Sequence, residues 1–246
     1  MPWDFALILF VLGVLVPWRG AVRIRQILAR PRLETADRLA LYASTVAFQW
    51  LAVGVVAWRC HARALTAQHL ALAFPEPELT ATTTLALSLL LGASQLYGLR
   101  RLARLPADRQ GFLHQMARKV MPQNFVEALA FVALAATVSL CEEFLYRGFV
   151  FAVLQDAARD SLLLAALGSS LFFALAHFYQ GRRGLASTFV VGLLFALARI
   201  LTGSFAPGIV AHLVADLFAG LRAPRLLAER ASPTGAATTF DPREGR

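Results

Sequence analysis

Long apolar tracts constrain the fold of this chain more than any other feature of its sequence. A helix needs about 20 predominantly apolar residues to cross a bilayer, and seven tracts approach that length. The first, sixth and seventh are short for a full crossing. The tracts lie at about 4–18, 39–58, 80–99, 125–150, 161–178, 185–201 and 206–221.

Composition agrees with this interpretation. The chain is 58% hydrophobic and 16% charged, whereas soluble domains are about 45–50% apolar and about 25% charged. The tracts are continuous apolar runs and lack the alternation of a membrane barrel. The predicted fold class is therefore all-α, a polytopic membrane helical bundle with about seven transmembrane helices. Asp4 replaces the basic start of a signal peptide, so the first tract is expected to be an uncleaved helix.

The basic residues alternate between loops. Of the 24 lysines and arginines, six lie between tracts one and two, six between three and four, two between five and six, and five after tract seven. The alternate loops, 59–79, 151–160 and 202–205, hold only three. This positive-inside pattern predicts an outside N-terminus and a cytoplasmic C-terminus. It favours a lipid bilayer over nucleic acid as the partner of the basic loops.

Ionisable groups are costly inside a membrane span and usually face the interior of the helix bundle. In this chain they are concentrated in the second half. Near the span ends, Glu127 and Arg199 are expected to snorkel toward the surface. The groups in the spans of the second half are Glu127, Glu142, Glu143, Arg147, His177, Arg199, His212 and Asp216.

The spacing of these ionisable residues predicts which of them share a helix face. Glu143 and Arg147 are four residues apart, so they share a helix face and can pair. Glu142 points about 100° away and lacks that partner, which makes it the candidate general base. His212 and Asp216 repeat the four-residue spacing, as do Phe173 and His177.

Other interpretations of these groups remain open. Glu143 and Arg147 alone could be a structural pair, a single histidine in a span often only bonds a neighbouring helix, and Phe173 could be simple core. Cys141 precedes Glu142, but a buried thiol in apolar surroundings is usually inert. The H-E-x-x-H pattern of zinc proteases is absent, and only Asp216 is available for an aspartyl mechanism. A glutamate-based hydrolytic site is the hypothesis that remains.

Three short motifs occur in order in this region. E-E-x-x-x-R corresponds to residues 142–147, F-x-x-x-H to 173–177 and H-x-x-x-N/D to 212–216. Together they make the chain resemble the CPBP family (CAAX proteases and bacteriocin-processing enzymes, also called the ABI family) of intramembrane glutamic endopeptidases. The resemblance covers about residues 120–221. Many members carry Asn at the final motif position, where this chain has Asp216.

The resemblance implies hydrolysis of a peptide bond within the membrane. Glu142 would activate a water that His177 helps to hold, and His212 with Asp216 would stabilise the oxyanion. Glu143, Arg147 and Phe173 would organise the site. An amide can donate to an oxyanion, whereas an ionised Asp216 cannot, so this carboxylate is expected to orient His212 instead.

The resemblance also divides the chain. Residues 1–110 are expected to be N-terminal transmembrane helices with basic cytoplasmic loops, 111–222 the CPBP-type protease core, and 223–246 a disordered polar tail. The basic loop at 100–124 could hold an amphipathic helix on the membrane surface. Spans five and seven pose a difficulty: straight crossings would place His177 and His212 at different depths, so the two can meet only through tilt, a bent span or a water cavity at mid-depth.

The expected substrate is a membrane-associated protein or peptide, cleaved near its membrane-proximal or C-terminal end. The Arg-rich, Lys-poor composition is compatible with a GC-rich bacterium and its cytoplasmic membrane. It favours a lipoprotein, peptide precursor or sorting signal over a prenylated tail. No cofactor is expected, and zinc is the rival because Glu142, His177, His212 and Asp216 are zinc ligand types. Two other functions stay open: a non-catalytic protein of the bacteriocin-immunity or scaffold type, and a proton-coupled transporter.

Overall fold

A computed structural model describes residues 1–105 and 111–228, and helices dominate both ranges. Two segments, η1 and η3, are π-helices that continue an α-helix on either side, and η4 is a single 3₁₀ turn. The elements in chain order are α1 (Trp3–Phe10), η1 (Val11–Leu15), α2 (Val16–Ala29), α3 (Thr35–Ala62), α4 (Pro77–Ala103), α5 (Gly111–Lys119), α6 (Phe125–Glu142), η3 (Glu143–Val150), α7 (Phe151–Ala157), α8 (Leu162–Ala176), η4 (Phe178–Gln180), α9 (Gly181–Thr202) and α10 (Ala206–Ala228).

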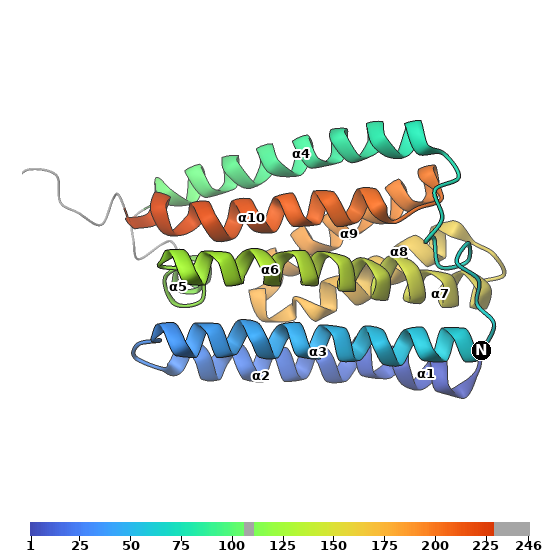
Figure 1. Ribbon diagram of the computed structural model, residues 1–246, viewed down its shortest axis with the longest axis horizontal. Helices are drawn as coiled ribbons and strands as arrows, with labels where there is room; N and C mark the ends of the chain where they lie inside the picture. The colour runs from blue at the N-terminus through green and yellow to red at the C-terminus, as the bar shows by residue number, and fades with distance from the viewer. Residues whose placement is uncertain (106–110, 229–246) are drawn as a thin grey trace, which may run out of the picture.

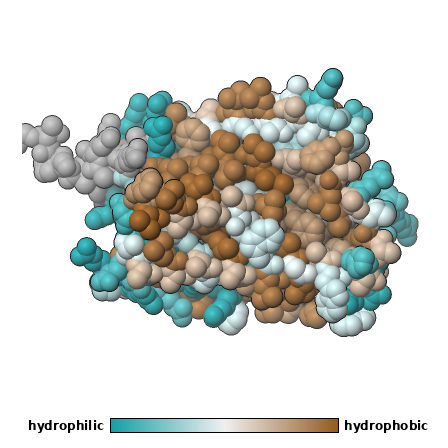
Figure 2. Space-filling view, viewed as in Figure 1, coloured by the Kyte–Doolittle hydropathy of each residue, from teal (hydrophilic) through white to brown (hydrophobic). Residues whose placement is uncertain are grey.

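Within the described residues, six helical stretches are long and apolar enough to cross a membrane. All seven predicted tracts form helices, but the fifth yields only the 15-residue α8. Figure 2 shows a hydrophobic band across the middle of the molecule, with hydrophilic residues gathered toward the two ends of the helices. The chain is therefore an integral membrane protein, and the predicted all-α membrane bundle is confirmed.

The long helices run side by side with their axes close to parallel (Figure 1). Helix α10 packs along both α4 and α6, and α3 packs against α6 on its other side. The connection from α2 to α3, helix α5 and the end of α10 lie at one end of the bundle, and the N-terminus lies at the other (Figure 1). The basic α2–α3 connection and helix α5 thus lie at the same end of the bundle.

Side-chain caps explain where several helices begin. Asn124 accepts a hydrogen bond from the Glu127 backbone N–H at 2.9 Å, and Ser161 accepts one from Leu164 at 3.3 Å. At the start of α3, Glu34 and Asp37 form a reciprocal capping box. Such caps satisfy backbone donors that the first turn of a helix leaves free.

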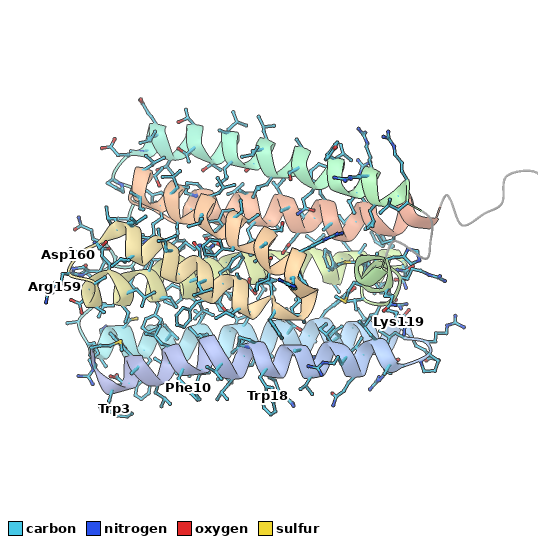
Figure 3. All side chains as sticks on the ribbon, turned by 180° about the vertical axis from the view of Figure 1, so that it is seen from behind. Trp3, Phe10, Trp18, Lys119, Arg159 and Asp160 are labelled. Carbon is cyan, nitrogen blue, oxygen red and sulfur yellow. The ribbon has the colours of Figure 1, made fainter. Side chains whose placement is uncertain are left out.

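The bundle has apolar side chains outside and many polar ones inside. Trp3, Phe10 and Trp18 project from one outward face of the α1–η1–α2 helix (Figure 3) and are 74%, 51% and 64% exposed. Lipid is the medium in which such a surface is stable. By contrast, Glu143 and Arg147 are fully buried, as expected for ionisable groups in a membrane bundle.

Two polar groups do not snorkel as the sequence predicted. Glu127 is fully buried, because Arg38 of α3 donates to both of its oxygens at 2.8 and 3.0 Å. Arg199 is 7% exposed: it donates to the His69 carbonyl at 2.9 Å and lies 3.7 Å from the centre of the Phe151 ring. Partners on neighbouring segments hold both groups inside the protein, which position along a span could not reveal.

The short helix α8 explains how His177 can lie near His212, although straight crossings would place the two at different depths. At 15 residues and 1.5 Å per residue, the helix is about 22 Å long, so it ends before completing a crossing. Residue 177 follows its last turn, and the chain reverses through η4 into α9. Gly181 has φ +77°, a left-handed conformation that favours glycine at this reversal. His177 is therefore held inside the bundle by the end of a helix.

Of the two segments that flank the core, one agrees with the prediction and the other differs from it. Helix α5 forms within the basic 100–124 loop, where an amphipathic helix was expected. Helix α10 continues to Ala228, so residues 223–228 are helical and do not begin the predicted polar tail. Residues 229–246, the rest of that tail, lie outside the described part of the chain.

Candidate active site

Glu142 is the last residue of α6, where the chain passes into the π-helix η3. Its Oε1 accepts a hydrogen bond from the Gln49 side-chain amide at 2.9 Å. Its Oε2 is buried and has no hydrogen-bond partner among the described residues. One oxygen is thus held in place and the other is available for a water molecule.

Glu143 forms the predicted pair with Arg147. The two side chains are fully buried, and Arg147 Nη1 donates to Glu143 Oε1 at 3.0 Å. Arg147 Nη2 donates to the Gly192 carbonyl of α9 at 3.1 Å. The pair therefore ties η3 to α9, which supports an organising role for both residues. The π-helix that carries them is of a kind frequently found at functional sites.

His177 follows α8 as its C-cap residue. Its Nδ1 lies 2.9 Å from the Phe173 carbonyl oxygen. A carbonyl can only accept, so Nδ1 carries the proton in this contact. In the neutral ring Nε2 is then an acceptor, able to hold a water by one of its hydrogens.

The Phe173 ring packs among the polar groups of the site. Its centre lies 4.1 Å from the Arg147 guanidinium carbon, and 4.9 and 5.7 Å from the ring centres of His177 and His212. A guanidinium over a ring face is a favourable cation–π contact. Phe173 thus fixes the relative positions of three ionisable side chains from three segments.

His212 lies on α10 between two carboxylates. Its Nδ1 is 3.4 Å from Glu143 Oε1, and its Nε2 is 3.7 Å from Asp216 Oδ2. The ring is nearly buried, whereas the Asp216 side chain is 35% exposed. His212 and Asp216 thus share a face of α10, as their four-residue spacing predicted.

A cavity of about 110 Å³ joins part of this group. That volume is ample for water, which takes up roughly 30 Å³ in the liquid. Glu142 and His177 both line the cavity, whereas His212 and Asp216 do not. The lining residues are Leu12, Val16, Phe48, Gln49, Ala52, Glu142, Leu145, Tyr146, Ala176, His177 and Tyr179.

The structure therefore brings the seven predicted residues together as two neighbouring groups of side chains. Glu142 and His177 face the cavity, and His212 with Asp216 lies behind, joined through Glu143 and Phe173. Sequence reasoning missed Gln49, which among the described residues is the one that donates to the Glu142 carboxylate. A polar side chain inside the predicted span 39–58 was the available signal, but nothing linked it to a partner 93 positions away.

A zinc site would need three or four of the candidate ligands around one point. In the described ranges, no three His, Cys, Asp or Glu side chains come together in a group that could hold a metal ion. Glu142 and His177 share the cavity, but the other two candidate ligands lie outside it. Cys60 and Cys141 are buried free thiols.

Together these features define a class: a polytopic helical membrane protein with a buried carboxylate–imidazole site. Comparison with protein families gives a more specific similarity. Residues 124–218 match the Rce1-like family, described as type II CAAX prenyl endopeptidase Rce1-like. The matched segment contains all three motifs, so the resemblance to CPBP-type enzymes is confirmed over these residues. The match supports a CAAX-type intramembrane protease.

The chain is also similar to a protein of Escherichia coli that is described as an uncharacterized 24.3 kDa protein. It is 35% identical over 100 residues, which cover 40% of this chain and 45% of that protein. The chain thus aligns with less than half of this relative's length. No solved structure matches the chain.

Proposed function

We propose that this protein is an intramembrane endopeptidase in which Glu142 activates a water to hydrolyse a peptide bond. The observation that carries the proposal is the buried Oε2 of Glu142, which has no hydrogen-bond partner among the described residues, beside a cavity that Glu142 and His177 both line. A general base must lie within hydrogen-bond reach of the proton that it removes, and a water in this cavity meets that condition.

The proposed reaction begins with a water held between Glu142 Oε2 and His177 Nε2. Glu142 takes a proton from the water, and the resulting hydroxide attacks the carbonyl carbon of the scissile peptide. The protonated Glu142 then gives that proton to the leaving amine as the C–N bond breaks. Gln49, Glu143 and Arg147 hold the surrounding groups in position throughout.

We assign oxyanion stabilisation to His212, as the resemblance implies. Both ring nitrogens face carboxylates, and a ring protonated on both sides would be paired with each of them. Asp216 is the more exposed partner, so an approaching substrate carbonyl can displace it and accept from Nε2. Preorganised donors of this kind usually make the largest contribution to acyl-transfer catalysis.

The proposed substrate is a membrane-associated protein or peptide cleaved near its membrane-proximal or C-terminal end, and the proposed location is a bacterial cytoplasmic membrane. The apolar outer surface and the family match support a substrate that reaches the site from within the bilayer. A bacteriocin-processing role is one form that this activity could take.

The direct test is the Glu142→Gln variant, which keeps the shape of the side chain and its contact with Gln49 but removes the base. Mass spectrometry of membrane peptides should show products in cells with the wild-type protein and none in cells with the variant, at equal amounts of folded protein. A phenotype that persists in Glu142→Gln cells, without any product peptide, would favour a non-catalytic role. Proton-coupled flux without cleavage would favour a transporter.

The proposed mechanism uses no metal, and zinc is its rival. Purified protein should cleave its substrate at the same rate before and after strong chelation. Activity that is lost on chelation and restored by zinc alone would replace the glutamate mechanism with a metal-assisted one.

A further inference from the structure

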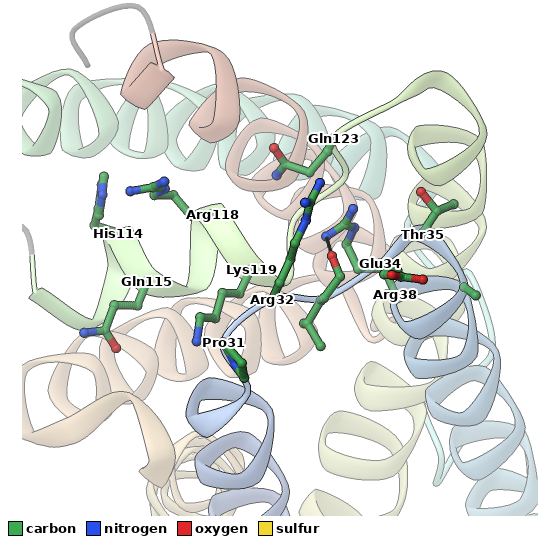
Figure 4. Close-up of a pocket in the computed structure, with 12 residues that line it drawn as sticks. Pro31, Arg32, Glu34, Thr35, Arg38, His114, Gln115, Arg118, Lys119 and Gln123 are labelled. Carbon is green, nitrogen blue, oxygen red and sulfur yellow. Dashed lines mark hydrogen bonds between the residues drawn. The ribbon is translucent and has the colours of Figure 1, made fainter. Parts of the chain in front are cut away.

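A second and larger cavity lies at the end of the bundle where the basic segments gather. Its volume is about 930 Å³, and it is formed by the α2–α3 connection, the first turn of α3, helix α5 and the segment before α6 (Figure 4). It is separate from the candidate active site, with which it shares no lining residue. The residues that line it are Pro31, Arg32, Leu33, Glu34, Thr35, Ala36, Arg38, His114, Gln115, Arg118, Lys119 and Gln123.

The lining of this basic pocket carries four Arg or Lys side chains and one carboxylate, Glu34. Glu34 is engaged in the capping box of α3, and Arg38 is neutralised by Glu127 behind it. The lining therefore keeps a net positive charge even when Arg38 is counted as neutralised.

Two of its cations are free to bind an anion. Arg32 and Arg118 are exposed, and neither has an acceptor among residues 1–105 and 111–228. They come from different segments and border the same pocket (Figure 4). His114 adds a further group, because its Nδ1 is buried and lacks a partner within the described residues.

The walls of the pocket are fixed by contacts of their own. Lys119 donates to the carbonyl oxygens of Leu28 and Arg30, each at 2.5 Å, which attaches the end of α5 to the α2–α3 connection. The Tyr42 hydroxyl donates to the Val120 carbonyl at 2.5 Å and attaches the same segment to α3. The free cations thus border a built cavity and do not belong to an unsupported loop.

We propose that the basic pocket binds the phosphate group of an anionic lipid headgroup. The pocket lies where the apolar spans end: α6 begins two residues after Gln123, and its first residues, Phe125 and Val126, are 75% and 58% exposed. A lipid bound here would place its phosphate near Arg32 and Arg118 and its chains along this apolar surface. Basic pockets between membrane helices bind anionic headgroups in this way, and the volume exceeds what a free phosphate ion would fill.

The proposal is tested by native mass spectrometry of the full-length protein in a neutral detergent. The probes are phosphatidylglycerol, phosphatidylcholine with the same acyl chains, and sodium phosphate. The wild-type protein should retain phosphatidylglycerol in preference to phosphatidylcholine. The Arg32→Gln/Arg118→Gln variant should bind phosphatidylglycerol about thirtyfold more weakly, since each of the two basic side chains near the surface contributes roughly 1 kcal/mol and about 1.4 kcal/mol is tenfold in affinity.

Arg100→Gln/Arg101→Gln is the matched control. Both of its arginines are exposed in the last turn of α4, and it removes the same charge while leaving the pocket intact. It should bind phosphatidylglycerol as the wild type does. If the pocket variant elutes as an aggregate, the single variants Arg118→Gln and Arg100→Gln make the same comparison.

Three results would overturn the proposal. Equal losses in the pocket and control variants would mean that binding is spread over the basic surface. Equal retention of both lipids would mean that the headgroup charge is not recognised. Sodium phosphate that displaces phosphatidylglycerol at equal concentration would identify a free anion, and not a lipid, as the ligand.

Discussion

The two carboxylate oxygens of Glu142 have different surroundings, and that difference determines which oxygen can act as the base. Oε1 is occupied by the Gln49 amide, and Oε2 has no partner in the described part of the chain. A base with one anchored oxygen presents the other at a fixed position, and a small displacement of a reacting group can reduce a rate about a hundredfold. Gln49 is therefore a positioning residue for the proposed reaction.

Gln49→Leu should reduce kcat by about ten- to hundredfold, because a hydrogen bond to a charged group contributes roughly 1.5–3 kcal/mol. KM should change little, since Gln49 acts through Glu142. The measurement is steady-state cleavage of a peptide substrate by purified protein at matched folded concentrations.

Thr45→Val provides the control on the same helix. Thr45 lies one turn before Gln49, and its hydroxyl donates to the Leu41 carbonyl of the same helix, α3. The variant should stay within about twofold of the wild-type rate. Equal losses in the two variants would show that α3 tolerates no change and that Gln49 has no particular role.

Single residues show where sequence reasoning reaches its limit. Spacing along one helix identified Glu143 with Arg147 and His212 with Asp216, and the structure confirms both pairs. It could not identify Gln49, and it misjudged Glu127, because their partners lie 93 and 89 positions away. Periodicity describes contacts within a helix, whereas these contacts depend on which helices become neighbours.

At the scale of elements, the approach of α10 to η3 depends on a glycine. A Cβ on Gly208 would lie 2.5 Å from Glu143 Oε2, a separation too short for unstrained contact. The missing side chain lets α10 bring His212 to within 3.4 Å of Glu143.

Gly208→Ala should therefore lower the free energy of unfolding by about 1–3 kcal/mol and reduce cleavage, as α10 and η3 move apart. Gly54→Ala is the matched control, because a Cβ there meets nothing within 4 Å. That variant should be neutral or gain about 0.5–1 kcal/mol. Thermal unfolding in detergent compares them; a Gly208→Ala protein as stable as Gly54→Ala would contradict the close packing.

Helices α3 and α6 are joined by the buried Arg38–Glu127 pair. Arg38→Leu leaves the Glu127 carboxylate buried without its cation, so the free energy of unfolding should fall by about 3–5 kcal/mol. The double variant Arg38→Leu/Glu127→Leu removes both charges and should recover most of that loss. Denaturation of purified protein in detergent measures it, and a double variant less stable than Arg38→Leu would contradict the predicted sign.

Apolar length predicted the existence of these elements better than their internal form. All seven tracts are helical, yet nothing in their composition distinguishes the π-helical turns of η1 and η3 from the α-helix around them. Nor did hydropathy show that α8 stops at Ala176, because the apolar run continues through Phe178. Packing against neighbouring helices decides such details, and hydropathy along a single sequence does not show which helices become neighbours.

At the scale of the whole molecule, charge predicts how the bundle sits in its membrane. The α2–α3 connection, α5 and the end of α10 share one end of the structure (Figure 1). We expect that end to face the cytoplasm, because basic loops are retained there.

Single cysteines would establish the orientation. In intact bacterial cells, Gln68→Cys should react with a membrane-impermeant maleimide, and Pro31→Cys should react only after the membrane is opened. The native thiols give little background, since Cys60 and Cys141 are 2% and 0% exposed. The reverse labelling pattern would place the basic end outside and contradict the charge argument.

The contact between Gln49 and Glu142 also bears on how enzymes of this architecture can be divided or recombined. Gln49 lies on α3, outside the matched segment 124–218, while Glu142 lies within it. A C-terminal half could be excised, or grafted onto unrelated N-terminal helices. Either protein would retain all three motifs but would lack Gln49, the donor that positions Glu142. Transplanting the proposed activity is therefore expected to require α3 as well as the helices that carry the motifs.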